Sequence, residues 1–303
     1  MNSLWPWIIF IVFVLTLLAL DLGVFHRRPH PLRFREAAGW SAFWVALSLA
    51  FNLGIYWRYG AEAALQFFTS YLLEKSLSAD NIFLFAVIFA SMGVAAEYQH
   101  RVLFWGVLGA LALRGAFIVA GVQLVRHFHV VLYFFAVFLL FMGVRLLREQ
   151  EKKYDPTSSR VIRLARRLFP ISERYEGGRF FTRVDGRLCA TPLLLVLLMI
   201  EVVDLTFAMD SIPAIFSVTQ DAFIIFTSNV LAILGLRSLY FLLARALSRF
   251  HYLRTALAVI LIFIGARMLF TPWVHIPTGT ALLGILLILG IAILASLVTE
   301  AKD

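Results

Sequence analysis

Charged residues and cysteine are both scarce in this chain. Of its 303 residues, 15% are charged and 61% are hydrophobic, and the mean hydropathy is +0.87. A soluble domain carries about a quarter charged residues, so the composition argues against a soluble protein. The single cysteine, Cys189, excludes a disulfide framework and a cluster of thiolate ligands. The composition is therefore typical of an integral membrane protein built from helices.

Long apolar runs recur along the whole chain, and several approach the length of about 20 residues that crosses a bilayer as a helix. They predict an all-α, polytopic membrane protein with about nine transmembrane helices. The expected spans are residues 4–25, 37–57, 69–93, 101–123, 129–147, 191–218, 222–244, 252–270 and 278–298.

Two connecting segments differ sharply in length and charge. Segment 58–68 is expected to be a short linker, whereas segment 148–190 is a long, basic loop. Within that loop, Val161, Leu164, Ala165 and Leu168 recur at helical spacing among arginines. The segment could be an amphipathic helix lying on anionic membrane lipid, or simply a solvated basic loop.

The net charge of +9 does not indicate nucleic acid as a partner, because the positive charges cluster between the apolar runs. Most Lys and Arg residues outside the spans fall on one side when the spans alternate from an outer N-terminus. Basic loops face the cytoplasm. The distribution therefore predicts an N-terminus outside the membrane, the 148–190 loop in the cytoplasm and a cytoplasmic C-terminus.

Two parts of the chain resemble each other. "EKSLSADN" begins at Glu74 and "DLTFAMDS" begins at Asp204, so both pair an acid with an Asp six positions later. The next span carries "LRG" around Arg114 in one part and "LRS" around Arg237 in the other, and the third ends in F-x-G-x-R. A unit of three helices must insert its second copy from the opposite face of the membrane, as in the inverted repeats of secondary transporters.

The repeat divides the chain into five parts. They are two N-terminal helices (1–57), a first three-helix repeat (69–147), the basic loop (148–190), a second three-helix repeat (191–270) and a last helix with the C-terminus (271–303).

Five acidic residues fall inside the third and sixth expected spans, where a charged side chain at a helix centre costs about 2.5–3.5 kcal/mol to insert. They would strain insertion unless they faced the protein interior and found partners. Pro213 could unwind a turn beside Asp210 and free a backbone carbonyl. Carboxylates, amides, hydroxyls and carbonyls are ligands of hard cations. The candidate metal ligands are Asp80, Asp210, Glu74, Asp204, Asn81, Ser211, Glu201 and, at the end of the first span, Asp21.

The acids could instead pair with intramembrane bases. Lys75, Arg114 and Arg237 are available as structural ion-pair or gating residues. Acids in the spans outnumber these bases, and a bound divalent cation would close the deficit. The seven histidines lie in loops or near span ends, so zinc and copper are poor candidates. Oxygen ligands favour Mn²⁺, Ca²⁺ or Mg²⁺, and the ligand types do not choose among them.

The stretches "EKSLSADN" and "EVVDLTFAMDSIP" closely resemble the two signature motifs of the TerC/Alx family of bacterial membrane proteins. The similarity extends to "LDLGVF" in the first helix and to "NVLAILGLRSLYFLL" from Asn229. The resemblance implies a multi-pass protein of the bacterial inner membrane, linked to tellurium resistance or to manganese efflux. It implies Mn²⁺ export, with Asp80 and Asp210 as the first candidates for coordination.

Two functions from different classes fit these observations. The first is a secondary transporter that exports Mn²⁺, with exchange for protons as one way to drive it, since the chain has no P-loop. The second is a metal-binding membrane scaffold of a stress-resistance complex that recruits partners through the 148–190 loop. An enzyme is not expected, because the acids have no accompanying nucleophile or mid-span histidine, and no organic cofactor is expected.

Overall fold

Ten helices and one β-hairpin make up the described part of the chain in a computed structural model. The structure describes residues 4–20, 34–148, 162–163, 167, 170–172, 174–184, 186–243, 252–274 and 276–300. The first five helices are α1 (Trp5–Leu20), α2 (Phe34–Tyr59), α3 (Ala61–Ser91), α4 (Ala96–His127) and α5 (Val130–Arg148). The hairpin pairs β1 (Phe181–Val184) with β2 (Arg187–Ala190). The remaining helices are α7 (Pro192–Phe216), α8 (Ala222–Leu234), α9 (Leu236–Leu243), α10 (Leu253–Phe270) and α11 (Thr278–Glu300).

The predicted helical membrane fold is confirmed, and the hairpin is an addition to it. Six of the described helices are long and apolar enough to cross a membrane, or seven if α8 and α9 form one bent span. The helix α1 has 16 residues, and α3 carries Glu74, Lys75 and Asp80 within its 31 residues. Neither of them is among the six, so the count of nine spans stays a prediction.

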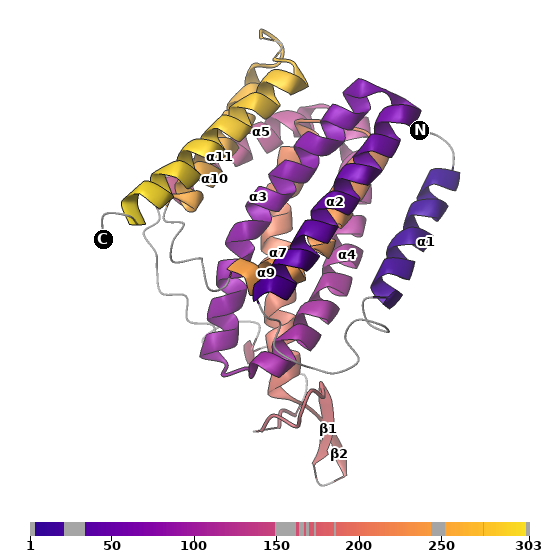
Figure 1. Cartoon of the computed structure of the whole chain (residues 1–303), viewed down its shortest axis with the longest axis vertical. Coiled ribbons are helices and arrows are strands. Elements are labelled where there is room, and N and C mark those ends of the chain that lie inside the picture. The colour runs from indigo at the N-terminus through magenta and orange to yellow at the C-terminus, as the bar shows by residue number, and fades with distance from the viewer. Residues whose placement is uncertain are drawn as a thin grey trace.

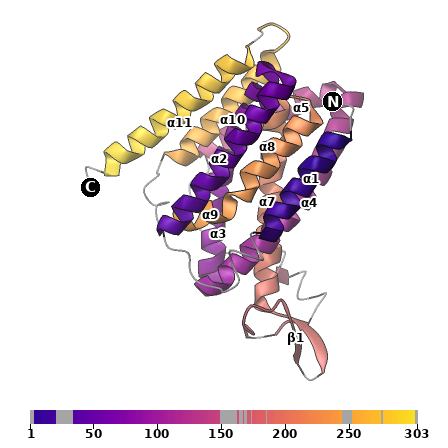
Figure 2. The ribbon, with the colours of Figure 1, turned by 45° about the vertical axis from the view of Figure 1, so that its right-hand side comes forward.

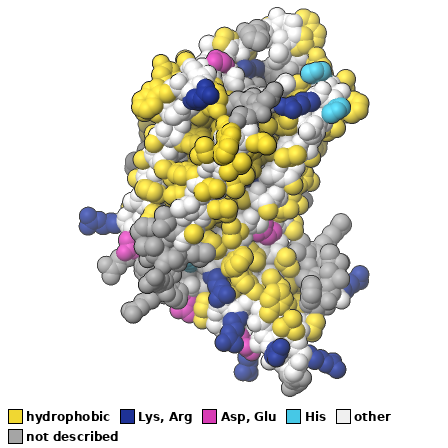
Figure 3. All heavy atoms as spheres, turned by 90° about the vertical axis from the view of Figure 1, so that its right-hand side faces the viewer, with side chains coloured by type: hydrophobic (Ala, Val, Ile, Leu, Met, Phe, Trp, Pro, Cys, Tyr) yellow, Lys and Arg dark blue, Asp and Glu magenta, His cyan; other side chains and the backbone are white. Residues whose placement is uncertain are grey.

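Hydrophobic side chains cover much of the face drawn in Figure 3, while most of its Lys and Arg side chains lie toward the two ends. Several large apolar residues on the outer helices are more than half exposed, including Phe134 of α5 and Leu283 and Ile291 of α11. Contiguous exposed apolar surface of this kind fits contact with lipid.

The helices α3 and α7 lie in the middle of the molecule. Each contacts the other; α3 also packs on α2, α8 and α9, and α7 on α4 and α5. The helix α1 lies at one side of this group, and α10 and α11 lie at the other (Figures 1 and 2). The hairpin projects from the end of the bundle where α7 begins (Figure 1). Side chains in the middle of α3 and α7 are consequently enclosed by other helices.

Two expectations about the backbone are wrong. The expected linker 58–68 is helical except at Gly60, because α2 runs to Tyr59 and α3 begins at Ala61. Gly60 makes the turn with φ of 90°, a conformation that a side chain would strain. In addition, α7 continues as a helix through Pro213 to Phe216 without an unwound turn. The broken helix is instead the pair α8 and α9, which are bent by 42°.

The close approach of α5 and α10 depends on one glycine from each helix. A Cβ on Gly143 of α5 would lie 2.8 Å from the carbonyl oxygen of Ala258, and a Cβ on Gly265 of α10 would lie 2.9 Å from that of Ala136. Each contacted alanine precedes the glycine of its own helix by seven residues. The contact is therefore reciprocal and antiparallel, and the inverted repeat itself stays a prediction.

The segment 161–168, for which an amphipathic helix is one prediction, falls mostly outside the described residues. In this segment the structure describes Ile162, Arg163 and Arg167. Between residues 170 and 191, the chain folds back onto the bundle. The Tyr175 hydroxyl donates to the Met92 carbonyl at 2.6 Å, and the Arg101 guanidinium lies 5.4 Å from the centre of the Phe180 ring. These contacts fix the base of the hairpin on the α3–α4 connection.

Candidate functional site: a buried ionic cluster

A single arginine in the middle of α4 joins the two halves of the molecule. Arg114 is 2% exposed and forms ion pairs with Glu74 of α3 and with Asp204 of α7. The arginine reaches these acids because α4 packs directly on α7, where small residues permit a close approach. A Cβ on Gly106 of α4 would lie 3.2 Å from the Ile200 side chain. The two acids occupy matching positions in the two similar sequence motifs.

Asp204 receives a two-point contact from the guanidinium. The Nε atom of Arg114 donates to Oδ2 at 3.0 Å, and Nη2 donates to Oδ1 at 2.9 Å. Such a paired arrangement is stronger and more directional than a single charged hydrogen bond. Asp204 is 2% exposed, so little water competes for its carboxylate.

Glu74 is held by three side chains from three helices. Nη1 of Arg114 donates to its Oε1 atom, and Ser78 donates to the same oxygen at 3.3 Å. The Nδ2 atom of Asn229, from α8, donates to Oε2 at 3.0 Å. The carboxylate therefore ties α3, α4 and α8 together.

Glu74, Arg114 and Asp204 bring two formal negative charges and one positive charge into a buried space. Taking such charges out of water costs several kcal/mol per ion, and the cost is recovered only when the geometry is good and hydrogen bonds satisfy the remaining atoms. Ser211, from α7, and Asn229 each place an oxygen 3.5 Å from Nη1 of Arg114. The surrounding polar groups are thus part of what makes the burial tolerable.

The other predicted ligands lie around this cluster in different ways. Asn81 is 1% exposed, and its Oδ1 atom has no hydrogen-bond partner among the described residues. Asp210 of α7 is partly buried and lies within electrostatic reach of Arg145 from α5. The backbone of Asp80 is helical within α3, but its side chain is outside the described part of the structure, as is the whole of Asp21.

Glu201 is partly buried, and its carboxylate lies against Gly109 of α4, where a Cβ would overlap Oε1 and would displace the carboxylate. Its Oε2 atom has no hydrogen-bond partner among the described residues. Glu201 therefore remains apart from the Arg114 ion pairs, although Asp204 is only three residues away on the same helix.

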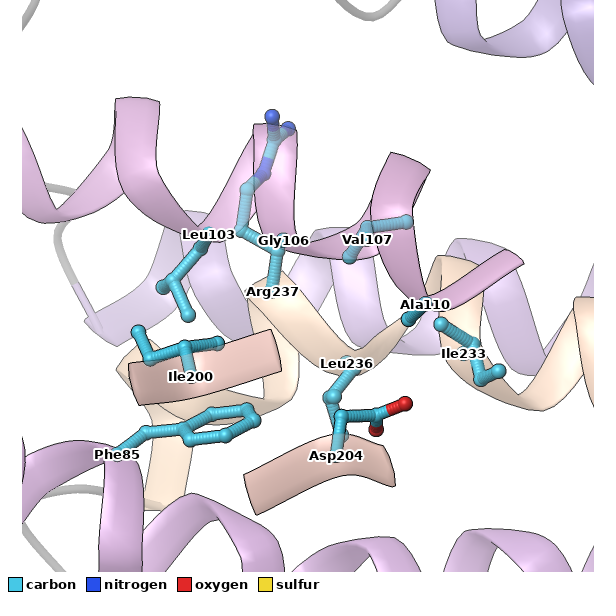
Figure 4. A pocket seen from close by; sticks show the side chains of 10 residues that line it. All are labelled: Phe85, Leu103, Gly106, Val107, Ala110, Ile200, Asp204, Ile233, Leu236 and Arg237. Carbon is cyan, nitrogen blue, oxygen red and sulfur yellow. The ribbon is translucent and has the colours of Figure 1, made fainter. Parts of the chain in front are cut away.

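The three predicted bases do not share one role. Arg114 binds the acids, whereas Lys75 donates from Nζ to the carbonyl oxygen of Ala232 at 3.1 Å. Lys75 thus contacts a backbone carbonyl, and the expectation that it neutralises a neighbouring acid finds no ion pair among the described contacts. Arg237 and Asp204 line a small cavity of about 10 Å³, roughly the space for one water. The Arg237 guanidinium points away from Asp204 (Figure 4).

In the structure, Glu74 and Asp204 are paired with an intramembrane base, Arg114. Among the side chains that the structure describes, no group of three or more His, Cys, Asp or Glu residues is arranged to hold a metal ion. An unwound turn at Pro213 does not bring Asp210 toward Asp204, because α7 stays helical there. Metal binding by these acids consequently stays a prediction, and a metal would have to replace Arg114 at two of them.

Two contributors to the cluster were not predicted from the sequence as site residues. Asn229 binds Glu74, and Ser78 lies one helical turn after Glu74 on α3. A polar amide within the apolar run of α8 was an available signal for Asn229. Ser78 carries a weak signal, because serines in membrane helices commonly bond to their own backbone.

Comparison with known proteins agrees with this membrane architecture. The model of the family described as "Integral membrane protein TerC family" matches residues 59–303. The chain belongs to the TerC family of integral membrane proteins. No solved structure matches the chain.

Three relatives illustrate the range of names in the family. An uncharacterized membrane protein of Myxococcus xanthus is 51% identical over 96% of this chain and 92% of its own length. A protein of Escherichia coli K12 named putative membrane-bound redox modulator Alx is 45% identical over 90% of this chain and 88% of its own. An uncharacterized membrane protein of Rickettsia bellii is 40% identical over 97% of both chains.

Proposed function

We propose that this chain is a secondary transporter that exports a hard divalent cation, with Mn²⁺ as the first candidate. The observation that carries the proposal is that Glu74 and Asp204, from the two halves, both pair with the buried guanidinium of Arg114. Intramembrane acids that face the bundle interior commonly mark an ion path.

Arg114 acts in this proposal as the internal counter-cation of the resting protein. When no metal is bound, its guanidinium neutralises the two carboxylates and keeps their burial tolerable. An entering divalent cation would compete for the same oxygens, and Asp80, Asn81, Ser211, Glu201 and Asp210 would supply further oxygen ligands along the path. The ligands are all hard oxygens, which suits Mn²⁺, Ca²⁺ or Mg²⁺.

The export direction and the exchange with protons belong to the same proposal. Carboxylates that lose the metal on protonation would couple the two ions. The membrane would be the bacterial inner membrane, with the N-terminus outside and the C-terminus in the cytoplasm. Mn²⁺ uptake into inverted vesicles should then collapse when a protonophore is added, and uptake unchanged without a gradient would rule out the coupling.

The direct test of the ion path is the manganese content of cells that express the wild-type chain, Asp80→Asn or Asp210→Asn. Asparagine has nearly the shape of aspartate and removes the charge. Wild-type expression should lower cellular manganese after a Mn²⁺ challenge, and both variants should fail to lower it. Variants that are present in the membrane and still lower manganese as the wild type does would defeat the proposal.

The second candidate function is a metal-binding scaffold, favoured by the hairpin that projects from the bundle. Phe181 and Leu188 are 47% and 63% exposed on it, beside the exposed Arg183. Replacing residues 181–190 by a short Gly-Ser linker separates the two functions. A transporter should keep its metal flux, whereas a scaffold should lose its bound partners. The name redox modulator, which the relative from E. coli carries, has little chemical support here, since Cys189 is the chain's one thiol.

A further inference from the structure

The break between α8 and α9 leaves a helix C-terminus inside the bundle. Helix α8 ends at Leu234, Gly235 follows as its cap, and α9 starts at Leu236 at an angle of 42°. The last carbonyl groups of a helix have no amide donor of their own helix and carry the negative end of its dipole. Ala232 lies in this last turn and is fully buried.

The donor for this end comes from another helix. Nζ of Lys75, on α3, lies 3.1 Å from the Ala232 carbonyl oxygen. A Cβ on Gly235 would lie 2.8 Å from the same Nζ and 3.0 Å from Cβ of Trp44, on α2. The ammonium group therefore sits directly on the bend, and Trp44, which is 5% exposed, closes the space beside it.

Lys75 makes this contact although an acid precedes it in the chain. The carboxylate of Glu74 is engaged by Arg114, Ser78 and Asn229. Residues adjacent in a helix point in directions about 100° apart, so Lys75 faces the α8–α9 junction while Glu74 faces Arg114. The ammonium thus makes its hydrogen bond to the helix end, and it interacts with Glu74 only through longer-range electrostatics.

Carbonyl ends of interrupted membrane helices bind monovalent cations in secondary transporters. Here a side chain brings a monovalent cation to such an end. We propose that the C-terminal end of α8 is a monovalent-cation site that Lys75 fills with its own ammonium group. Lys75 is thereby the positioning residue of the α8–α9 bend. This role concerns the folded protein and does not require the chain to be a transporter.

The proposal predicts chemical rescue that depends on the space left by the substitution. Lys75→Ala removes the cation and opens a gap into which a small ammonium ion fits. Lys75→Met also removes the cation, but its side chain fills most of the gap. The neighbouring Ser76→Ala is a matched control, because the Ser76 hydroxyl bonds to Leu72 within α3 and not to the junction.

The experiment measures thermal unfolding of the purified, full-length variants in detergent, with choline chloride or ethylammonium chloride at equal ionic strength. In choline, Lys75→Ala should unfold at least about 3 °C below the wild type, a shift typical of one lost interaction in a chain of this size. Ethylammonium should restore most of that loss in Lys75→Ala and none in Lys75→Met. The wild type and Ser76→Ala should not distinguish the salts.

Equal responses of Lys75→Ala and Lys75→Met to every salt would overturn the proposal. An ethylammonium effect of the same size on the unfolding temperature of the wild type would also overturn it. If Lys75→Ala does not fold in any of the salts, the test compares amide hydrogen exchange at residues 236–239 in Lys75→Arg, which keeps the cation, and in Lys75→Met, which lacks it. The bend should stay protected with arginine and exchange at least about tenfold faster with methionine. Equal protection in these two variants would contradict the assignment.

Discussion

The second helices of the two similar halves carry the same Leu-Arg motif on different backbones. Helix α4 runs unbroken for 32 residues, and its Arg114 binds both Glu74 and Asp204. The corresponding segment of the other half is divided into α8 and α9, and the break comes two residues before Arg237. The Arg237 side chain points away from Asp204 (Figure 4). The arginine that reaches the acids is thus the one on the unbroken helix.

One residue in each motif accounts for part of this difference. Gly235 precedes "LRS" where Ala112 precedes "LRG". Alanine is the best helix former, and glycine is about 1 kcal/mol worse. Gly235 also has the Lys75 ammonium and Trp44 against it, whereas Ala112 is exposed on the outside of α4. The third helices of the two parts do not differ in this way. The helices α5 and α10 make a reciprocal contact through Gly143 and Gly265.

The strongest way to break the comparison is to remove the arginine that α4 supplies. Arg114→Met would leave two carboxylates buried without their cation, and breaking a buried pair costs about 3–5 kcal/mol. The thermal midpoint in detergent should fall steeply. If the acids also bind a transported metal, added Mn²⁺ should raise the midpoint of Arg114→Met more than that of the wild type.

Arg126→Met is the control for this prediction, because Arg126 is an exposed basic residue in the last turn of the same helix. It should change the midpoint little. An Arg114→Met protein as stable as the wild type would show that the buried cluster does not hold the halves together. A large loss of stability without any response to Mn²⁺ would favour a purely structural cluster.

A second test asks whether the contact between α5 and α10 is as symmetrical as its geometry at Gly143 and Gly265 indicates. Gly143→Ala and Gly265→Ala each place a Cβ within 3 Å of a backbone carbonyl of the other helix, and overpacking of this kind costs about 1–3 kcal/mol. The two losses in unfolding free energy should be nearly equal. Gly290→Ala, on α11 with open space around it, is the control and should have no such loss. Clearly unequal losses would contradict a symmetrical contact.

Much of the cluster was predictable from the sequence, because charge inside an apolar run must find a partner. That reasoning located Glu74, Asp204 and Arg114, and the comparison of the two motifs added Ser211; the structure brings all four together. Counting charges does not say which acid an arginine takes, since that depends on how helices distant in the sequence are packed. The contribution of Asn229 depends on the same packing, as α8 contacts α3 only in the folded bundle.

The position of the backbone break was predicted wrongly for a physical reason. Proline removes one hydrogen bond, and a membrane helix tolerates this where neighbouring helices support it. Pro213 is buried among well-packed residues near the end of α7, so the helix continues. Gly235 lowers helix stability less than a proline does. The helix nevertheless breaks there, because Lys75 from α3 donates to a carbonyl at the end that the break exposes. The sequence pattern alone contains no measure of that long-range contact.

The mildest test introduces into α4 the residue found at the break. Ala112→Gly should cost about 1 kcal/mol, the difference in helix propensity between the two residues. The side chain of Ala112 is exposed, so the change removes little packing. If continuity of α4 is what aims Arg114 at the acids, amide exchange should rise around residues 112–116 while the ion pairs still hold α4 in place.

Adding Asn229→Ala, which removes a donor to Glu74, should then lower the unfolding midpoint by more than the two single losses together. Strict additivity would mean that the arginine is held by its partners alone and that the unbroken backbone of α4 does not position it.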